Sequence, residues 1–114
     1  MRGSIGDKQR LLHILDAIAA IEEYVKDAAL ITFESNSMMQ FASIKQIEII
    51  GEASNNITAG TKDKLPEINW PKIIGMRHIL VHEYFGIDTS VIWQVINQNL
   101  PELKSSISSI IDSL

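Results

Sequence analysis

Apolar residues recur at intervals of three and four along most of this 114-residue chain, a spacing typical of helices that bury one face. It predicts a helix over residues 7–27, a second over 37–58 and a third that begins at Trp70-Pro71. No stretch alternates apolar and polar residues for long enough to predict a strand. The apolar positions of the first two helices are Leu11, Leu12, Ile14, Leu15, Ile18, Ile21, Val25, Phe41, Ile44, Ile47, Ile50, Ala53 and Ile57.

The residues between these segments predict where the helices start and stop. Asp7 or Ser4 is expected to cap the first helix, and Gly60 is expected to follow the end of the second. Residues 28–36 are predicted to form a link, and residues 59–69 a loop with at most a short turn.

The second half of the chain carries similar signals. Gly86 is expected just past the end of the third helix, Asp88 at the start of a fourth, and Pro101 at the start of a last one. The predicted fold class is therefore all-α, a four- to five-helix bundle in a single domain that spans residues 1–114. Residues 1–6 are expected to be disordered or to derive from an expression tag. The apolar positions of the last two helices are Val91, Ile92, Val95, Ile96, Leu103, Ile107, Ile110 and Ile111.

The third helix has no continuous polar face. A helix that is apolar nearly all round is buried nearly all round. In a bundle this small, one of its faces is expected to meet a second copy of the chain, which predicts a homodimer with this helix at the seam. Its apolar residues are Ile73, Ile74, Met76, Ile79, Leu80, Val81 and Phe85.

The composition narrows the classes of function. The formal charge of −4 argues against a protein that coats nucleic acid through a large basic face. Since the chain has no cysteine, disulfides, thiolate nucleophiles and cysteine-ligated zinc are excluded. No apolar run approaches the ~18 residues of a membrane span, so no membrane association is expected and the expected location is the cytoplasm.

Basic residues are nevertheless concentrated before and within the third helix. They could form a local positive field that guides a phosphate group, or they could be scattered, solvated lysines. Between residues 62 and 78 the cations are Lys62, Lys64, Lys72 and Arg77, against Asp63 and Glu67.

The side chains that can transfer a proton or bind a phosphate group are concentrated in one segment, Arg77-His78-Ile79-Leu80-Val81-His82-Glu83-Tyr84. His82 titrates near neutral pH and can act as a base, while Arg77 offers a charged fork of donors suited to phosphate oxygens. A base beside a phosphate clamp can cut RNA without a metal ion, because the 2′-hydroxyl then attacks its own phosphorus. On a helix, positions 77 and 82 are roughly 140° apart, so Arg77 of one subunit would meet His82 of another more easily than its own.

Three other interpretations of these residues stay open. Arg77, Glu83 and the histidines could form a satisfied polar network at a subunit seam. His78 and His82, one turn apart, could bind a metal ion with a third ligand from Glu48 or Glu52. Tyr84 could simply pack in the core.

Several segments together resemble a known family. The pattern Arg-x-x-x-x-His-x-Tyr at Arg77, His82 and Tyr84, followed by Phe-Gly-Ile-Asp at 85–88, is similar to the signature of HepT-like toxins in the HEPN superfamily. The resemblance extends to residues 10–18, 47–53 and Trp70-Pro71, and so covers nearly the whole chain.

This resemblance implies a helical dimer with metal-independent endoribonuclease activity, no cofactor, RNA as substrate, and Arg77 and His82 as the catalytic pair. His78 and Glu83 are expected to support the active site. It also implies a partner, a minimal nucleotidyltransferase (MntA-like) antitoxin, which would neutralise the toxin by transferring AMP to Tyr84.

One departure from the family and one alternative function remain. The family usually has asparagine where this chain has His78, and a histidine there could assist catalysis or signal a weakened enzyme. The alternative function is a non-catalytic dimer of this fold whose motif pocket binds a nucleotide or a partner protein.

Overall fold

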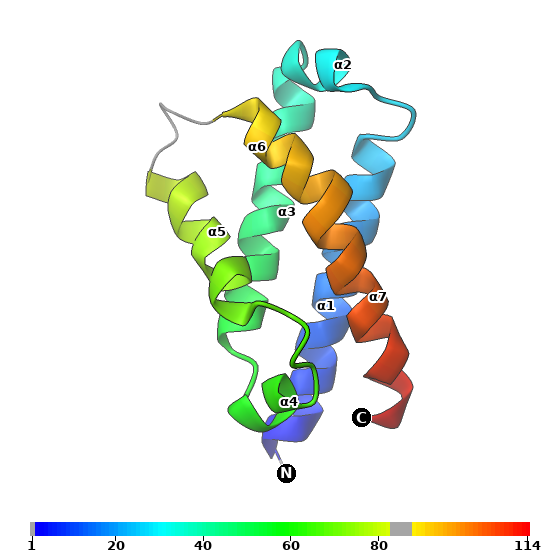
Figure 1. The fold of residues 1–114 in the computed structure, drawn as a ribbon, viewed down its shortest axis with the longest axis vertical. Coiled ribbons are helices and arrows are strands. Elements are labelled where there is room, and N and C mark those ends of the chain that lie inside the picture. The colour runs from blue at the N-terminus through cyan, green and yellow to red at the C-terminus, as the bar shows by residue number, and fades with distance from the viewer. Residues whose placement is uncertain (1, 83–87) are drawn as a thin grey trace.

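Two long antiparallel helices, α1 (Arg2–Tyr24) and α3 (Ser37–Asn55), lie side by side and form the frame of a helical bundle (Figure 1). The computed structural model describes the backbone of residues 2–82 and 88–114 and the side chains of residues 6–76 and 88–114. The predicted spacing is confirmed for most of the core, because one face of each long helix is buried, but it is wrong at Phe41, which is 63% exposed. The buried apolar residues on these two helices are Leu11, Ile14, Ala17, Ile18, Ile21, Ile44, Ile47 and Ile50.

A short helix, α2 (Leu30–Glu34), lies within the predicted link of residues 28–36. Its one buried side chain is Phe33, whose ring packs against that of Trp93 with centroids 5.2 Å apart. The Gln40 side-chain amide donates to the Phe33 carbonyl over 2.7 Å and so ties the end of α2 to α3. A five-residue helix with one buried residue has no periodicity to detect, which explains why the prediction missed it.

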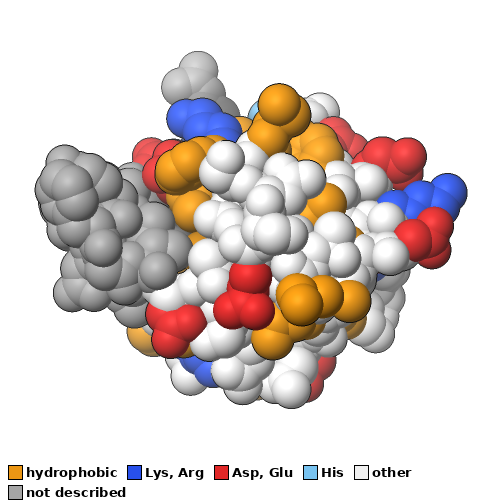
Figure 2. All heavy atoms as spheres, turned by 90° about the horizontal axis from the view of Figure 1, so that it is seen from above, with side chains coloured by type: hydrophobic (Ala, Val, Ile, Leu, Met, Phe, Trp, Pro, Cys, Tyr) orange, Lys and Arg blue, Asp and Glu red, His pale blue; other side chains and the backbone are white. Residues whose placement is uncertain are grey.

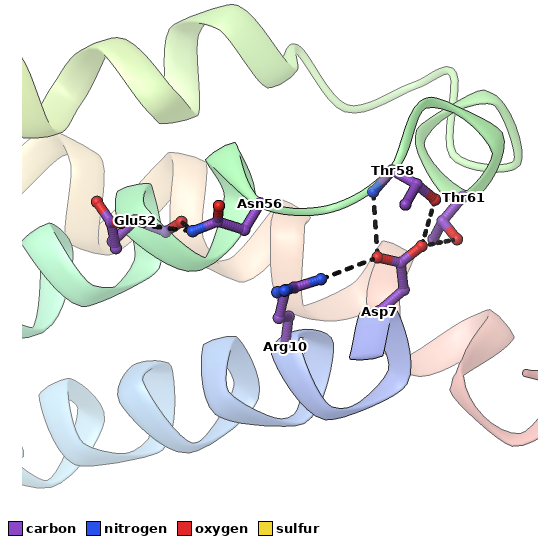
Figure 3. Close-up of polar contacts among 6 residues, drawn as sticks. All are labelled: Asp7, Arg10, Glu52, Asn56, Thr58 and Thr61. Atoms are coloured by element: carbon purple, nitrogen blue, oxygen red, sulfur yellow. Dashed lines mark hydrogen bonds and ion pairs between the residues drawn. The ribbon is translucent and has the colours of Figure 1, made fainter. Parts of the chain in front are cut away.

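The expected cap of the first helix is wrong. The helix already begins at Arg2, so Asp7 lies inside it and its side chain is fully buried. Its carboxylate accepts hydrogen bonds from the Thr58 N–H (3.1 Å) and from the hydroxyls of Thr58 and Thr61 (Figure 3). The Arg10 guanidinium lies 3.6 Å from the same carboxylate. Asp7 therefore joins the start of α1 to residues that lie more than fifty positions later.

Burial raises the pKa of Asp7, but the hydrogen bonds from Thr58 and Thr61 and the charge of Arg10 outweigh it. The result is a pKa below the ordinary value of 3.8. A carboxylate stabilised in this way favours the folded state as long as it stays ionised.

Thr61 lies in a further short helix, α4 (Ala59–Asp63), and Thr58 is its N-cap residue, where a loop with at most a short turn was predicted. Gly60 lies inside this helix, and no described glycine has a positive φ, so Gly60 does not act as a left-handed cap. The α4 helix follows α3 after only three residues, and the bonds to Asp7 hold it against α1.

The third predicted helix, α5 (Trp70–His82), begins at Trp70 as expected. The Asn69 side chain accepts from the Lys72 N–H over 3.2 Å and so satisfies one free donor of the first turn. Pro71 needs no such partner because it has no N–H. The α5 helix runs antiparallel to α3 and packs along it (Figure 1).

The last part of the chain is helical without a break. It comprises α6 (Thr89–Gln94), a π-helical turn η2 (Val95–Asn99), α7 (Leu100–Ile110) and a 3-10 turn η3 (Ile111–Ser113). The predicted cap is confirmed, since the Asp88 side chain accepts from the Ser90 N–H over 2.9 Å. Pro101 lies in the first turn of α7, as predicted, but the helical backbone continues from η2 into α7 without a break. The Leu100 N–H bonds to the Val95 carbonyl, and the wider turn lets the chain pass the proline without breaking.

The all-α prediction is confirmed, because residues 2–82 and 88–114 contain helices and no strand. Gly86 lies outside the described residues. In the part of the chain that the structure describes, no helix has the length and apolarity needed to cross a membrane.

Replacing Asp7 with asparagine tests the link between α1 and α4. We expect Asp7→Asn to lower the free energy of unfolding at pH 7 by about 1–3 kcal/mol, because it removes the charged acceptor from buried donors. Since the folded pKa is lowered, this stabilisation is present above pH 3.8 and is lost as pH falls through the folded pKa. The difference in free energy of unfolding between the unaltered protein and Asp7→Asn, measured by urea unfolding, should therefore shrink as the pH is lowered. Asp63→Asn, at an exposed carboxylate of α4, is the control, and a difference that stays constant with pH would contradict the account.

Candidate functional site

The helix that carries the motif is held against the core by its first two turns. Trp70, Ile73 and Met76 are buried, and Ile73 and Met76 lie one turn apart on the face that packs toward α3. The Lys62 ammonium group lies 5.9 Å from the centre of the Trp70 ring, a cation–π contact between α4 and the start of α5. The direction of α5, and with it the placement of positions 77–82, follows from this buried face.

Helical geometry places the motif positions around the axis of α5, whose backbone stays helical through His82. Position 77 lies roughly 70° from the midpoint of the face marked by Ile73 and Met76, at the edge of the contact with α3. Positions 78 and 82 lie roughly 170° and 150° from it, on the side that faces away from the core. Within one protomer, Arg77 and His82 therefore occupy positions on different sides of the helix.

The two remaining motif residues, Glu83 and Tyr84, lie outside the described residues. They fall between the last residue of α5 and Asp88, which caps α6. The last turn of α5 and the first turn of α6 lie at the end of the bundle that also carries α2 (Figure 1). The predicted roles of Glu83 and Tyr84 stay predictions, as do those of the side chains of Arg77, His78 and His82.

Two carboxylates on α3, Glu48 and Glu52, were predicted as alternative metal ligands. Glu48 is half-buried and lies 3.8 Å from the Lys45 ammonium. Glu52 accepts a hydrogen bond from the Asn56 side chain over 3.4 Å (Figure 3). Among the described side chains no three metal-ligating groups lie together. His78 and His82 are not among them, so a metal site that includes these histidines stays a prediction.

The lysines of the basic segment predicted between residues 62 and 78 are not neutralised by ion pairs among the described side chains. Between the residues whose side chains the structure describes, no ion pair involves Lys62, Lys64 or Lys72. By contrast, the Lys104 ammonium lies 3.0 Å from the carboxylate of Glu22. The lysines near α4 and the start of α5 can therefore still contribute to a field that attracts phosphate.

The structure also contains a cavity that the sequence pattern gave no signal for. It has a volume of about 470 Å³ and lies between the start of α5 and α7, with Asn69, Lys72, Asn99 and Ser106 among its lining residues. Its lining comes from segments about thirty residues apart, so only the fold assembles it. Lys72 is ten residues before His82, roughly 15 Å along the helix axis, so the cavity does not lie beside position 82.

Comparisons with known proteins give the family. The model of the family described as "Ribonuclease HepT-like" matches residues 14–110, which include the whole motif. The chain belongs to the HepT-like ribonuclease family. Its all-α fold agrees with the resemblance to the HEPN superfamily.

Named relatives agree with this family. The chain is 36% identical to "Putative RNase MJ1380" of Methanocaldococcus jannaschii over 88% of this chain and 92% of that protein. It is 41% identical to "Probable ribonuclease HepT" of Thermococcus cleftensis over 85% of this chain and 88% of that protein. It is also 40% identical to "Gamma-glutamylcyclotransferase and putative RNase MJ0434" of M. jannaschii, over 91% of this chain but only 47% of that protein. No solved structure matched significantly.

Family membership makes this HepT-like chain an endoribonuclease and RNA its substrate class. The matched segment begins inside α1 and ends at the last residue of α7, so the family match spans the bundle described above. The motif and the buried face of α5 therefore both lie within the segment that the family model matches.

The buried face of α5 can be tested at Met76, the residue before Arg77. Met76 is 8% exposed, so we expect Met76→Ala to lower the free energy of unfolding by about 2–5 kcal/mol through lost contacts and a residual cavity. Met38, which is 80% exposed, provides the control. Met38→Ala should change the free energy of unfolding by less than about 0.5 kcal/mol. Urea unfolding followed by circular dichroism measures both. Equal effects of the two substitutions would mean that Met76 does not anchor α5.

Proposed function

We propose that this HepT-like ribonuclease cuts RNA without a metal ion, with His82 as the base and Arg77 as the phosphate clamp. His82 takes the proton of a ribose 2′-hydroxyl, and the freed oxygen attacks the adjacent phosphorus. The bond from phosphorus to the 5′-oxygen then breaks, and that oxygen takes up a proton. The products are a 2′,3′-cyclic phosphate and a 5′-hydroxyl, so atoms and charge balance without a co-reactant. The family match over residues 14–110 is the observation that carries this proposal.

Arg77 contributes by charge and shape. Charge builds up on the phosphate oxygens as the new bond forms, and a guanidinium can neutralise it with two parallel hydrogen bonds. His82 is the last described residue of α5, and its imidazole takes up the proton of the 2′-hydroxyl in the first step. A protonated imidazole is the form that can return a proton to the leaving oxygen.

We place His78 and Glu83 in supporting roles. Position 78 lies roughly 40° from position 82 around α5 and one turn before it, so both can face the same substrate. His78 can donate a hydrogen bond as an asparagine would, but its charge changes with pH. Glu83 follows His82 directly and is proposed to orient the imidazole.

We further propose that the working unit is a homodimer with a shared site. Positions 77 and 82 lie on different sides of α5, roughly 140° apart and 7–8 Å along its axis. An isologous contact between two α5 helices would place position 77 of one protomer near position 82 of the other, twice over. This arrangement explains why the outward positions of a helix in so small a bundle carry polar, titratable groups.

The proposed biological role is that of a toxin in a toxin–antitoxin pair. A minimal nucleotidyltransferase would act as antitoxin by transferring AMP from ATP to the hydroxyl of Tyr84, with release of pyrophosphate. Tyr84 is two residues beyond His82, so an attached nucleotide would bring bulk and negative charge next to the proposed catalytic pair. RNA phosphate would then be excluded by both size and charge repulsion.

Cleavage by the unmodified protein tests the catalytic pair. With a labelled RNA in EDTA we expect cleavage by the unaltered protein and a loss of at least a hundredfold in His82→Ala and in Arg77→Ala, as for removal of a general base or of a charged transition-state contact. His13→Ala, at an exposed histidine of α1, is the matched control and should keep full activity. Cleavage that EDTA abolishes would refute the metal-independent mechanism. If the unaltered protein and His82→Ala are equally inert, the non-catalytic, partner-binding alternative is the better account.

The modification is tested with the chain's two tyrosines. After incubation with a minimal nucleotidyltransferase of the proposed antitoxin class, ATP and Mg²⁺, we expect intact mass to rise by one AMP group and RNA cleavage to stop. Tyr84→Phe should gain no mass and stay active, whereas Tyr24→Phe should behave like the unaltered protein. Modification that persists in Tyr84→Phe would place the acceptor elsewhere.

A further inference from the structure

The cavity between the start of α5 and α7 is lined by polar side chains that the fold itself does not use. Among the described residues, the side chains of Lys72, Asn99, Glu102 and Ser106 make no hydrogen bond or ion pair. They come from two separate segments of the chain and converge on one space of about 470 Å³. These groups are therefore left to bind water or a ligand.

The π-helical turn η2 supplies part of the same wall. Its hydrogen bond runs from the Leu100 N–H to the Val95 carbonyl, and its last residue, Asn99, lines the cavity. Such turns are rare and occur frequently at functional sites. The widened turn and the unpaired side chains thus coincide at one place in the fold.

The charges of the lining indicate which part of an RNA chain fits. Lys72 is opposed by two carboxylates, Glu67 and Glu102, so the lining carries one net negative charge and repels a phosphate group. A nucleobase is uncharged, has donors and acceptors along its edges, and has flat faces that pack on apolar side chains such as Ile73 and Leu103. The volume falls within the ~300–1,000 Å³ of small-ligand sites. The cavity therefore suits a base.

Guanine matches the charged groups better than the other bases do. A carboxylate such as Glu102 can accept from the two N–H groups that guanine presents side by side at N1 and N2. An ammonium group such as Lys72 can donate to the neighbouring O6 and N7 acceptors. The other three bases have no such pair of adjacent N–H groups on a ring nitrogen and an amino group. The amide NH₂ groups of Asn69 and Asn99 are further donors at the same cavity.

Helix α5 provides a path from the motif to this cavity. Positions 72 and 82 lie within roughly 80° of each other around the axis and roughly 15 Å apart along it. At about 3.4 Å per stacked nucleotide, roughly four nucleotides span this distance. Gly75 lies between them on the same side, and apart from adjacent backbone no described atom lies within 4 Å of where its Cβ would be. A strand can therefore approach the helix closely at this point.

The distribution of charge favours this direction along α5. The end of the bundle that carries α2 presents acidic and apolar side chains (Figure 2), and Glu34 of α2 and Asp88 before α6 are exposed. Toward α4, by contrast, Lys62, Lys64 and Lys72 outnumber the carboxylates of residues 62–72. An RNA strand that leaves the motif is therefore drawn toward α4 and the cavity.

We propose that this cavity binds a guanine base of the RNA substrate, roughly four nucleotides from the bond that is cut. The inference rests on the proposed function, because His82 marks the place of the cut. Glu102 and Lys72 hold the edge of the base from the two walls of the cavity. The site takes no part in the reaction and selects which RNA sequence is positioned for it.

Binding of free nucleosides tests the cavity without any RNA cleavage. In a ¹⁵N-resolved NMR titration we expect guanosine to shift the N–H signals of Lys72 and Asn99 and to bind at least fivefold more tightly than uridine. Glu102→Gln should weaken guanosine binding at least fivefold. Glu23→Gln, at an exposed carboxylate of α1, is the matched control and should leave binding within twofold. Unshifted signals of Lys72 and Asn99, or equal affinity for the two nucleosides, would overturn the inference.

Cleavage of an RNA pool of random sequence gives a second measurement. Sequencing of the products should show guanine enriched at one position, roughly three to five nucleotides from the cut. Lys72→Gln and Glu102→Gln should lose this enrichment, whereas Lys26→Gln and Glu23→Gln, which change exposed charges outside the cavity, should keep it. An enrichment that all four variants share would place the recognition of guanine elsewhere and contradict the assignment.

The two measurements separate this inference from the proposed function. If guanosine binds in the cavity but RNA is not cut, the base site stands and the proposed function fails. If RNA is cut without a preference for guanine at a fixed distance, the proposed function stands and this inference fails.

Discussion

The antiparallel packing of α5 on α3 is the contact on which the rest of this account depends. Ile73 and Met76 bury one side of α5, and this fixes which positions of the motif face away from the core. The same contact directs α5 from the end of the bundle that carries α4 toward the end that carries α2 (Figure 1). A helix of thirteen residues is marginal alone, so it is this packing that keeps positions 77–82 helical.

The opposite end of the bundle is held by polar contacts. Asp7 connects the start of α1 to Thr58 and Thr61, and the cation of Lys62 lies over the ring of Trp70 where α5 begins. These contacts fix both α4 and the first residue of α5 relative to α1. The start of the motif helix is therefore placed by buried hydrogen bonds and a cation–π contact.

The helical class and most of the core could be predicted because each long helix buries one continuous face. Leu11, Ile18 and Ile47 all follow from spacing alone. Asp7 could not be placed, since its partners are more than fifty residues away and a capping residue looks the same as a buried one in sequence. Phe41 was misplaced for a related reason: the period identifies an apolar side chain on a helix but not whether its own chain or another molecule covers it.

The roles of the residues from Arg77 to Tyr84 stay predictions, because their side chains lie outside those that the structure describes. The residue types indicate a base and a phosphate clamp, the family resemblance implies a modifiable hydroxyl, and family membership gives RNA as the substrate class. The account stands on a site shared between protomers, and mixing two inactive variants tests this most directly. Arg77→Ala and His82→Ala protomers, mixed and verified as heterodimers, should regain up to half the activity of the unaltered dimer, because one intact site is restored. Heterodimers that cleave RNA no faster than either parent would contradict the shared site.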